Sequence, residues 1–211
     1  YGYNVAIGTF ALLNQNAADN AFNVAVGYSA GTNVTTGVRT VLVGGSAGDA
    51  LTTGSDNVAV GHAALGAEDT GAKNTAMGSY ALASLNFNGD GNNTAIGFNT
   101  GLSLSTGVQN TLMGGLAGDA LTTGGKNVAI GYLALSTENA HGDNVAIGHS
   151  ALTTLDAGAS GLNCAVGYFA GESVTTGVKN TLIGAQAGDA ITEGFNNIVV
   201  GYNAAASAVD V

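Results

Sequence analysis

Apolar and polar residues follow one short pattern that recurs twelve times from end to end of the chain. A polar residue, usually Asn, is followed by a β-branched residue, then most often Ala, then a large apolar residue and finally Gly. Successive copies are separated by 19, 17, 17 and 17 residues, and this series then repeats. Self-similarity at such a short period is typical of a solenoid. The copies begin at Asn4, Asn23, Thr40, Asn57, Asn74, Asn93, Asn110, Asn127, Asn144, Asn163, Asn180 and Asn197.

Each copy predicts a short β-strand of the type Val-Ala-Ile. Side chains alternate between the two faces of a strand, so the β-branched and large apolar columns share one face and the column between them takes the other. Gly closes the strand in all twelve copies, where the chain must turn sharply or let another backbone approach. Three residues later stands Ala, with Thr100 as the one exception. We expect a second strand there, so that each coil holds two short strands and two turns.

These features predict an all-β fold, a parallel β-solenoid of the β-roll type with twelve rungs of 17 or 19 residues. A coil of this length is too short for a βαβ crossover with a real helix, but it suits strands that pair with the next coil. Stacked strands lie about 4.8 Å apart, so twelve rungs give a rod on the order of 58 Å long. We expect a single domain over 1–211, built of three units of about 70 residues at 4–73, 74–143 and 144–211.

Large and small residues are distributed with a register of four rungs. After the Ala column, the first and fourth rungs of a unit carry Leu, apart from Ala205 in the last rung, and the second and third rungs carry Gly. The third rung replaces the middle strand residue by Leu, at Leu42, Leu112 and Leu182. In the third rung, a large Leu in the strand is therefore matched by Gly after the Ala column. Close packing across a thin core or between chains requires such a match of large and small residues.

The Asn column predicts a ladder of side-chain hydrogen bonds along the solenoid. Each amide can bond to its neighbours above and below and can satisfy backbone groups of the turns. Only Thr40 breaks this column.

Composition limits the partners. Only 9% of the residues are charged, the formal net charge is −10, and there are 35 Gly and no Pro. With four basic residues the chain has no electrostatic basis for binding nucleic acid or anionic membranes, and no apolar run reaches the roughly 20 residues that span a bilayer. An isolated soluble particle normally carries more surface charge, so we expect copies of the chain to cover much of its outer face. The single cysteine, Cys164, excludes an intrachain disulfide and is expected to be a buried thiol.

Rungs such as 127–131, Asn-Val-Ala-Ile-Gly, and 93–97, Asn-Thr-Ala-Ile-Gly, resemble the head repeats of trimeric autotransporter adhesins. The 17-residue rungs with Thr-Thr-Gly are more similar to the repeat arrays of phage tail fibres and bacterial surface fibres. The resemblance covers the whole chain. It implies a left-handed β-roll that trimerises around an axis and displays an attachment surface outside the cell. The chain departs from the adhesin heads in its longer coils.

Two groups of residues are candidates for ligand binding. Aromatic residues or His follow the strand-ending Gly in the second and fourth rungs, and Tyr28, Phe98 and Tyr168 stand there in the second rung of each unit. They can stack on glycan rings, or they can cover the small residues of the rung between or pack against a neighbouring chain. The 19-residue rungs carry longer loops at 12–22, 82–92 and 152–162, where Asn16, Asn86 and Asp156 are the candidates, because loops on a rigid scaffold are where binding varies.

Cofactor, metal and catalytic chemistry are not expected. His62, His141 and His149 do not fall in adjacent rungs of one column, and we predict that they lack companion carboxylates for a metal. Asp49, Asp119 and Asp189 recur in Ala-Gly-Asp-Ala, where Asp caps a turn, and the nonapeptide of calcium-binding solenoids is absent from the sequence. Regular arrays of Thr on a solenoid can bind ice, but the Thr pairs of this chain do not form an uninterrupted array. The sequence shows no set of catalytic residues, because its Gly and polar residues are explained by the repeat.

The sequence therefore favours an extracellular fibre segment, on a cell surface or virion, that acts as a rigid shaft and displays attachment loops. Its expected partners are further copies of itself, as a homotrimer or by end-to-end stacking, and a cell-surface glycan or protein receptor. One alternative is a single-chain solenoid that binds ice or glycan. The other is a subunit of a self-stacking extracellular filament.

Overall fold

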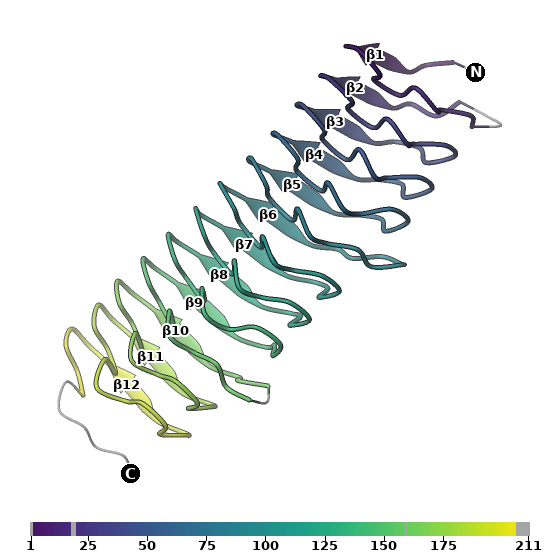
Figure 1. Ribbon diagram of the computed structural model, residues 1–211. Helices are drawn as coiled ribbons and strands as arrows, with labels where there is room; N and C mark the ends of the chain where they lie inside the picture. The colour runs from purple at the N-terminus through teal and green to yellow at the C-terminus, as the bar shows by residue number, and fades with distance from the viewer. Residues whose placement is uncertain (1, 18–19, 159, 206–211) are drawn as a thin grey trace.

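The computed structural model describes residues 2–17, 20–158 and 160–205 and is all-β. Twelve parallel strands of three residues form one sheet in chain order, and the coils stack into a rod with the termini at opposite ends (Figure 1). This confirms the predicted β-solenoid. No helix in the described ranges has the length and apolar character needed to cross a bilayer. The strands are β1 Val5–Ile7, β2 Val24–Val26, β3 Val41–Val43, β4 Val58–Val60, β5 Thr75–Met77, β6 Thr94–Ile96, β7 Thr111–Met113, β8 Val128–Ile130, β9 Val145–Ile147, β10 Cys164–Val166, β11 Thr181–Ile183 and β12 Ile198–Val200.

Neighbouring strands pair without any slip between the columns of the repeat. Ala95 in β6 lies opposite Leu112 in β7, and Leu112 lies opposite Ala129 in β8. The two extra residues of a 19-residue rung do not change this register, since Val5 in β1 still lies opposite Val24 in β2. The insertions are absorbed in the loops, so each of the three strand columns becomes a row of side chains along the rod.

The expected second strand is absent from the described coils, and the prediction of two strands per coil is wrong. The wall opposite the sheet is a run of turns, closed by bonds such as Ala30 N to Gly27 O and linked to the next coil by bonds such as Gly31 N to Ala47 O. Ser29 and Gly31 have φ of 56° and 58°. Left-handed residues at every second position cannot form the extended backbone of a strand, so this wall gains its inter-coil hydrogen bonds without becoming a sheet.

The core is a thin row of Ala and Leu side chains between the two walls. The middle residue of each strand from β2 to β11 points inward and is fully buried, whereas the residues that flank it are half-buried or exposed. A Cβ added at Gly31 would lie 2.5 Å from Leu42 Cδ1, and one at Gly118 would lie 3.0 Å from Leu112 Cδ2. This confirms the four-rung register and places it in the core of a single chain.

The glycine that ends each strand is required by the close approach of the next coil. Gly27 has φ of 139°, and a Cβ there would lie 2.5 Å from the carbonyl oxygen of Gly44. That atom is backbone and cannot move aside as a flexible side chain could. A residue with a side chain would therefore both strain the backbone and separate the coils.

The asparagine ladder is present as predicted. Asn93 Oδ1 accepts a hydrogen bond from the backbone N of Asn110 at 3.0 Å, and Asn110 Oδ1 accepts one from Asn127 N at 3.0 Å. The Asn110 amide also donates to Gly124 O, which links the residue before β7 to the turn that leads into β8. At the break in the ladder, Thr40 N and Oγ1 both donate to Asn23 Oδ1. These buried amides satisfy backbone groups that would otherwise be unpaired.

Candidate functional surfaces

The outer face of the sheet carries two columns of side chains along the rod. They come from the first and third residues of each strand, which point away from the core. The third-residue column is apolar in all twelve strands, whereas the first-residue column is Val, Ile or Cys in eight strands and Thr in four, at Thr75, Thr94, Thr111 and Thr181. Cys164 in the first-residue column is half-buried, so the prediction of a buried thiol is wrong. Met77, Met113 and Ile183 in the third-residue column have exposed fractions of 40%, 38% and 41%. The sequence pattern predicted that these two columns share a face. The structure shows that this face lies outside the core.

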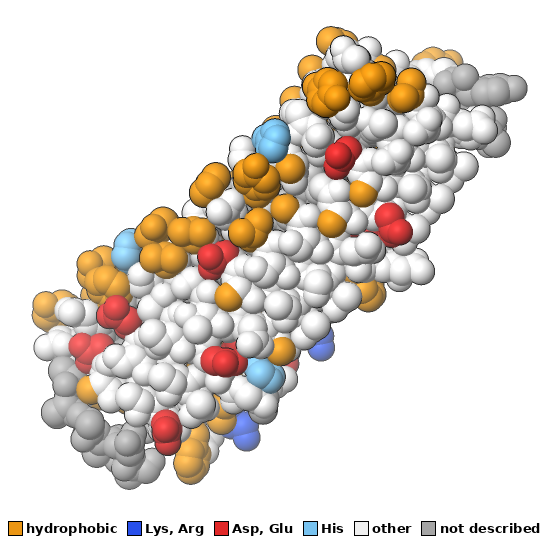
Figure 2. Space-filling view, viewed as in Figure 1, with side chains coloured by type: hydrophobic (Ala, Val, Ile, Leu, Met, Phe, Trp, Pro, Cys, Tyr) orange, Lys and Arg blue, Asp and Glu red, His pale blue; other side chains and the backbone are white. Residues whose placement is uncertain are grey.

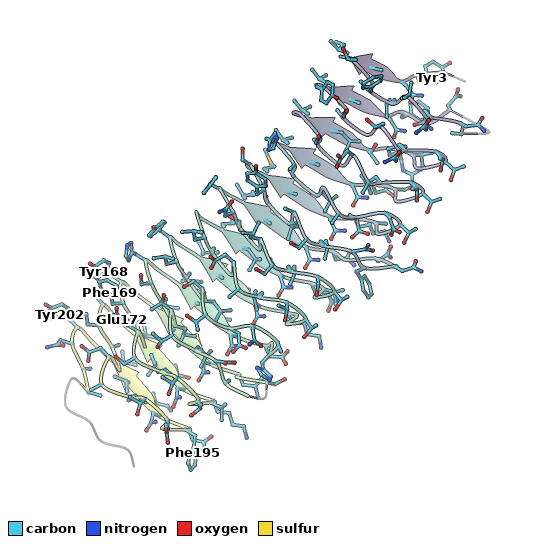
Figure 3. The ribbon with its side chains drawn as sticks, in the orientation of Figure 1. Tyr3, Tyr168, Phe169, Glu172, Phe195 and Tyr202 are labelled. Atoms are coloured by element: carbon cyan, nitrogen blue, oxygen red, sulfur yellow. The ribbon has the colours of Figure 1, made fainter. Side chains whose placement is uncertain are left out.

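Aromatic side chains form a second apolar row, beside the end of the sheet. Tyr28, Phe98 and Tyr168 all follow a strand-ending Gly and all are exposed. Figure 2 shows hydrophobic side chains in an interrupted row along the upper left edge of the rod, and Tyr168, Phe169 and Tyr202 lie on this edge in Figure 3. Both of the uses considered for these rings, stacking on a ligand or packing on the protein, are open to an exposed row.

The rings contact each other and the glycines between them. The ring of His149 lies 5.5 Å from that of Tyr132 and 5.4 Å from that of Tyr168, centroid to centroid, so three successive coils contribute to one stack. A Cβ added at Gly115 would lie 3.5 Å from Tyr132 Cδ2. The rings therefore do cover the small residues of the neighbouring rung, and their outer faces remain exposed.

The three candidate residues in the longer loops occupy equivalent places. Asn16, Asn86 and Asp156 are all exposed. The backbone N of each donates to a carbonyl in the next coil, at 2.8, 2.8 and 2.7 Å respectively. These loops extend to the right in Figure 1, whereas the labelled aromatic residues of the edge lie to the left in Figure 3. The structure thus separates the two groups of predicted ligand-binding residues onto opposite sides of the rod. Positions 18, 19 and 159 of the loops lie outside the described residues.

Two buried glutamates were missed by the sequence analysis. Glu68 and Glu138 point into the core at a position that is Leu, Val or Ile in most rungs, and both are fully buried. Glu68 Oε1 accepts a hydrogen bond from Gly71 N at 2.7 Å and Oε2 accepts one from Phe87 N at 3.3 Å. Burial raises the pKa of the Glu68 carboxyl, and these two hydrogen bonds act against that rise. The signal was available, because both residues interrupt a column that is Leu, Val or Ile in most rungs, as Gln15 does in the first rung.

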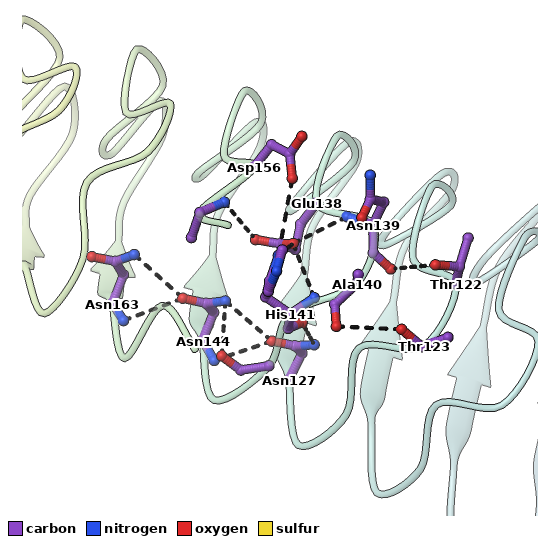
Figure 4. Close-up of polar contacts among 12 residues, drawn as sticks. Thr122, Thr123, Asn127, Glu138, Asn139, Ala140, His141, Asn144, Asp156 and Asn163 are labelled. Carbon is purple, nitrogen blue, oxygen red and sulfur yellow. Dashed lines mark hydrogen bonds and ion pairs between the residues drawn. The ribbon is translucent and has the colours of Figure 1, made fainter. Parts of the chain in front are cut away.

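Glu138 is joined by a histidine and an aspartate (Figure 4). His141 Nδ1 lies 3.0 Å from Glu138 Oε1 and 4.0 Å from Asp156 Oδ1. Among the described residues, this is the one group of three side chains placed to hold a metal ion, with potential ligand atoms within 4.8 Å of one another. The prediction that the histidines lack companion carboxylates is therefore wrong for His141. Its partners stand three residues before it and in the next coil, not in its own column.

Two exposed ion pairs outside this cluster link neighbouring coils. Arg39 Nε lies 2.6 Å from Asp56 Oδ1, and Lys73 Nζ lies 2.6 Å from Asp90 Oδ2. The guanidinium lowers the pKa of the Asp56 carboxyl, chiefly through their hydrogen bond. Such exposed pairs contribute little to stability. The part of the chain that the structure describes contains no pocket, so its candidate sites are surfaces.

Neither a protein-family model, nor a curated protein, nor a solved structure matches this chain.

Proposed function

We propose that this chain is a rigid segment of an extracellular fibre, assembled from three copies that meet through the outer faces of their sheets. One observation carries the proposal, namely the outer face of the sheet, where a continuous apolar column lies beside a column of Val, Thr, Cys and Ile. Eleven spacings of about 4.8 Å and a width of roughly 10 Å give this face an area on the order of 500 Å² per chain. A largely apolar face of this size is comparable to the largest apolar patch of a typical soluble monomer, and such patches are often binding surfaces.

The shape of the face suits a copy of the same rod. The side chains stand in straight columns, and a straight row on one rod can pack along the row of another over its whole length. Such a lengthwise interface has the apolar centre that is usual between subunits of a homo-oligomer. The number three comes from the resemblance to trimeric adhesin heads, in which the same rung motif is used.

The aromatic edge and the longer loops are the surfaces left for a receptor in this assembly. The exposed rings of Tyr132 and Tyr168, with the ring of His149 between them, form a row of neighbouring aromatic surfaces, and such rings stack on the faces of sugar rings. We propose that this edge gives the fibre its adhesive property. The test is binding of the assembled protein to a glycan array, in which Tyr168→Ala should reduce the signal and Phe195→Ala, on another side of the rod in Figure 3, should not.

The assembly is tested by sedimentation at several protein concentrations. The wild-type chain should have a constant mass of three chains. Met113→Glu and Ile183→Glu place charges on the outer face of the sheet, at side chains that a single chain leaves partly exposed, and they should reduce the mass to that of one chain. Phe195→Glu is the matched control, because Phe195 is also exposed but lies away from that face, and it should keep the mass of three.

Two outcomes would contradict the proposal. A wild-type mass of one chain at every concentration would favour a solenoid that acts alone on ice or glycan. A mass that grows steadily with concentration would favour a filament built by stacking of rods end to end.

A further inference from the structure

We infer that Glu138, His141 and Asp156 form a binding site for a first-row divalent transition-metal ion such as Zn²⁺. The site joins the turn after β8 to the long loop after β9. It lies within a single chain, so it is independent of the proposed trimer.

The geometry of the three ligand atoms fits such an ion. Ligands of a tetrahedral Zn²⁺ at about 2.1 Å lie roughly 3.4 Å from one another. The two distances from His141 Nδ1, 3.0 Å to Glu138 Oε1 and 4.0 Å to Asp156 Oδ1, bracket that value. Asp156 is half exposed and can turn toward the ion, whereas Glu138 is fixed by its surroundings.

The place where the first unit meets the second provides a natural comparison for this site, which lies where the second unit meets the third. Glu68 is the residue that corresponds to Glu138, but Gly71 stands in the place of His141 and Asn86 in the place of Asp156. Backbone N–H groups alone hold the Glu68 carboxylate. A buried glutamate in this column therefore needs neither a histidine nor an aspartate in order to be accommodated, and the pair His141 and Asp156 calls for another explanation.

Backbone groups also hold the Glu138 carboxylate, independently of the imidazole. Oε1 accepts hydrogen bonds from Asn139 N at 3.1 Å and His141 N at 3.2 Å, and Oε2 accepts one from Ala157 N at 3.3 Å. These hydrogen bonds orient the carboxylate before any ion binds. Hydrogen bonds to metal ligands orient those ligands in the same way in other metal sites. Its side chain is fully buried, so one wall of the site is dry.

His141 stands where the other 17-residue rungs with the same turn have glycine. In those rungs a side chain would lie against the next coil, since a Cβ at Gly107 would lie 2.2 Å from Gly124 O and one at Gly54 would lie 2.3 Å from Gly71 O. The glycines of this column are Gly37, Gly54, Gly71, Gly107, Gly124, Gly177 and Gly194. A histidine in a position that favours glycine, directly beside a buried carboxylate, points to a role for its imidazole.

The chemistry of the ligands selects the class of ion. An imidazole nitrogen with two carboxylates suits Zn²⁺ and its neighbours in the first transition row, whereas Ca²⁺ and Mg²⁺ prefer oxygen ligands only. In the absence of metal, one hydrogen atom lies between Nδ1 and Oε1. When the ion binds, this proton passes to water or, by way of water, to Nε2, so that the neutral ring carries its one N–H at Nε2 and Nδ1 gives its lone pair to the metal. Water completes the coordination on the exposed side, near Asp156.

The test is calorimetric titration of the metal-free protein with ZnCl₂, together with the absorption spectrum of the Co²⁺ form. Wild-type protein should bind one Zn²⁺ per chain, and Co²⁺ should show the visible bands of a site with nitrogen and oxygen ligands. His141→Gly and Asp156→Asn copy Gly71 and Asn86, so both should fold, and each should weaken binding by more than about tenfold. His149→Ala, in the aromatic stack, should bind as the wild type does.

A gain of function tests the same idea from the other side. Gly71→His together with Asn86→Asp copies the site to the place where the first unit meets the second. The added Cβ would lie 2.5 Å from Glu68 Oε1, so the Glu68 carboxylate has to shift to make room for it. The number of Zn²⁺ ions bound per chain should then rise from one to two. Wild-type protein that binds no Zn²⁺, or a His141→Gly variant that binds it as tightly as wild type, would overturn the inference. A constant stoichiometry in the Gly71→His, Asn86→Asp variant would also count against it, provided that circular dichroism shows a folded protein.

Discussion

Large apolar side chains stand on both the inner and the outer face of the sheet, but those on the inner face are buried and those on the outer face are partly exposed. Leu112 points inward and is fully buried, whereas its neighbour Met113 points outward and remains exposed. The inner face is completed by the chain itself, since glycines in the opposite wall make room for each leucine. The outer face has no such complement within the described chain. One strand pattern thus encodes both the fold of a single rod and an outer surface that the described chain leaves partly exposed.

The largest effect is expected from a cavity on the inner face. Leu112→Ala should lower the free energy of unfolding by about 2–5 kcal/mol, because the rigid coils around it cannot collapse into the space. Met113→Ala is the matched variant on the outer face. In a single chain it should lower the free energy of unfolding by less, because Met113 is already partly exposed. Urea unfolding at several protein concentrations separates the two, since only a loss at an interface depends on concentration. If both variants lost the same unfolding free energy, and neither loss depended on protein concentration, the two faces would not differ as proposed.

A swap of bulk between the walls sharpens the same comparison. In the fourth rung the strand residue is Ala129 and the opposite wall carries Leu135, which adopts a φ of 55°. The variant Leu112→Ala with Gly118→Leu gives the third rung this arrangement. It should recover a large part of the stability lost in Leu112→Ala, whereas Gly118→Leu alone should cost about 1–3 kcal/mol or more through overpacking. Additive losses in the double variant would show that the register does not depend on matched volumes.

The asparagine ladder is expected to give a smaller effect, because it borders the core without filling it. Asn110→Ala removes an acceptor from Asn127 N and leaves that group buried, at a cost of about 1–3 kcal/mol. Asn110→Thr should cost less, because a threonine hydroxyl can donate to Asn93 Oδ1 as the Thr40 hydroxyl donates to Asn23 Oδ1. It does not restore the acceptor of Asn127 N. Thermal unfolding of both variants is the measurement. If Thr were worse than Ala, the ladder would depend on the shape of the amide rather than on hydrogen bonding.

The sequence predicted most of the fold because each coil repeats one local solution. The strand, its glycine, the asparagine ladder and the exchange of Leu for Gly all follow from columns of identical residues. The second strand could not be predicted in this way, since the left-handed φ of residues such as Ser29 and Leu12 is not visible in an Ala-rich segment. The site at Glu138 was missed for the opposite reason. It depends on residues that depart from the period and that come together only when the coils stack.

The smallest expected effect is the pH dependence of stability that comes from a carboxyl group at the edge of the core. Asp119 follows Gly118 in the turn wall, and its Oδ1 is buried without a hydrogen-bond partner among the described residues. Burial raises the pKa of this carboxyl. The folded state therefore favours the protonated form, so the ionised carboxylate costs stability above the folded pKa, and this cost disappears as the pH falls toward the unfolded value.

Asp119→Asn should consequently be more stable than the wild type at pH 7, and the difference in melting temperature should shrink as the pH falls to about 4. Asp56 gives a control of opposite sign, since Arg39 lowers its pKa. Asp56→Asn should be slightly less stable than the wild type at pH 7, and that difference too should fade in acid. If the melting temperature of Asp119→Asn instead followed that of Asp56→Asn, the Asp119 carboxylate would have to be stabilised in its ionised form. A hydrogen-bond donor from a neighbouring chain could do this, and the turn wall would then belong to the assembly interface.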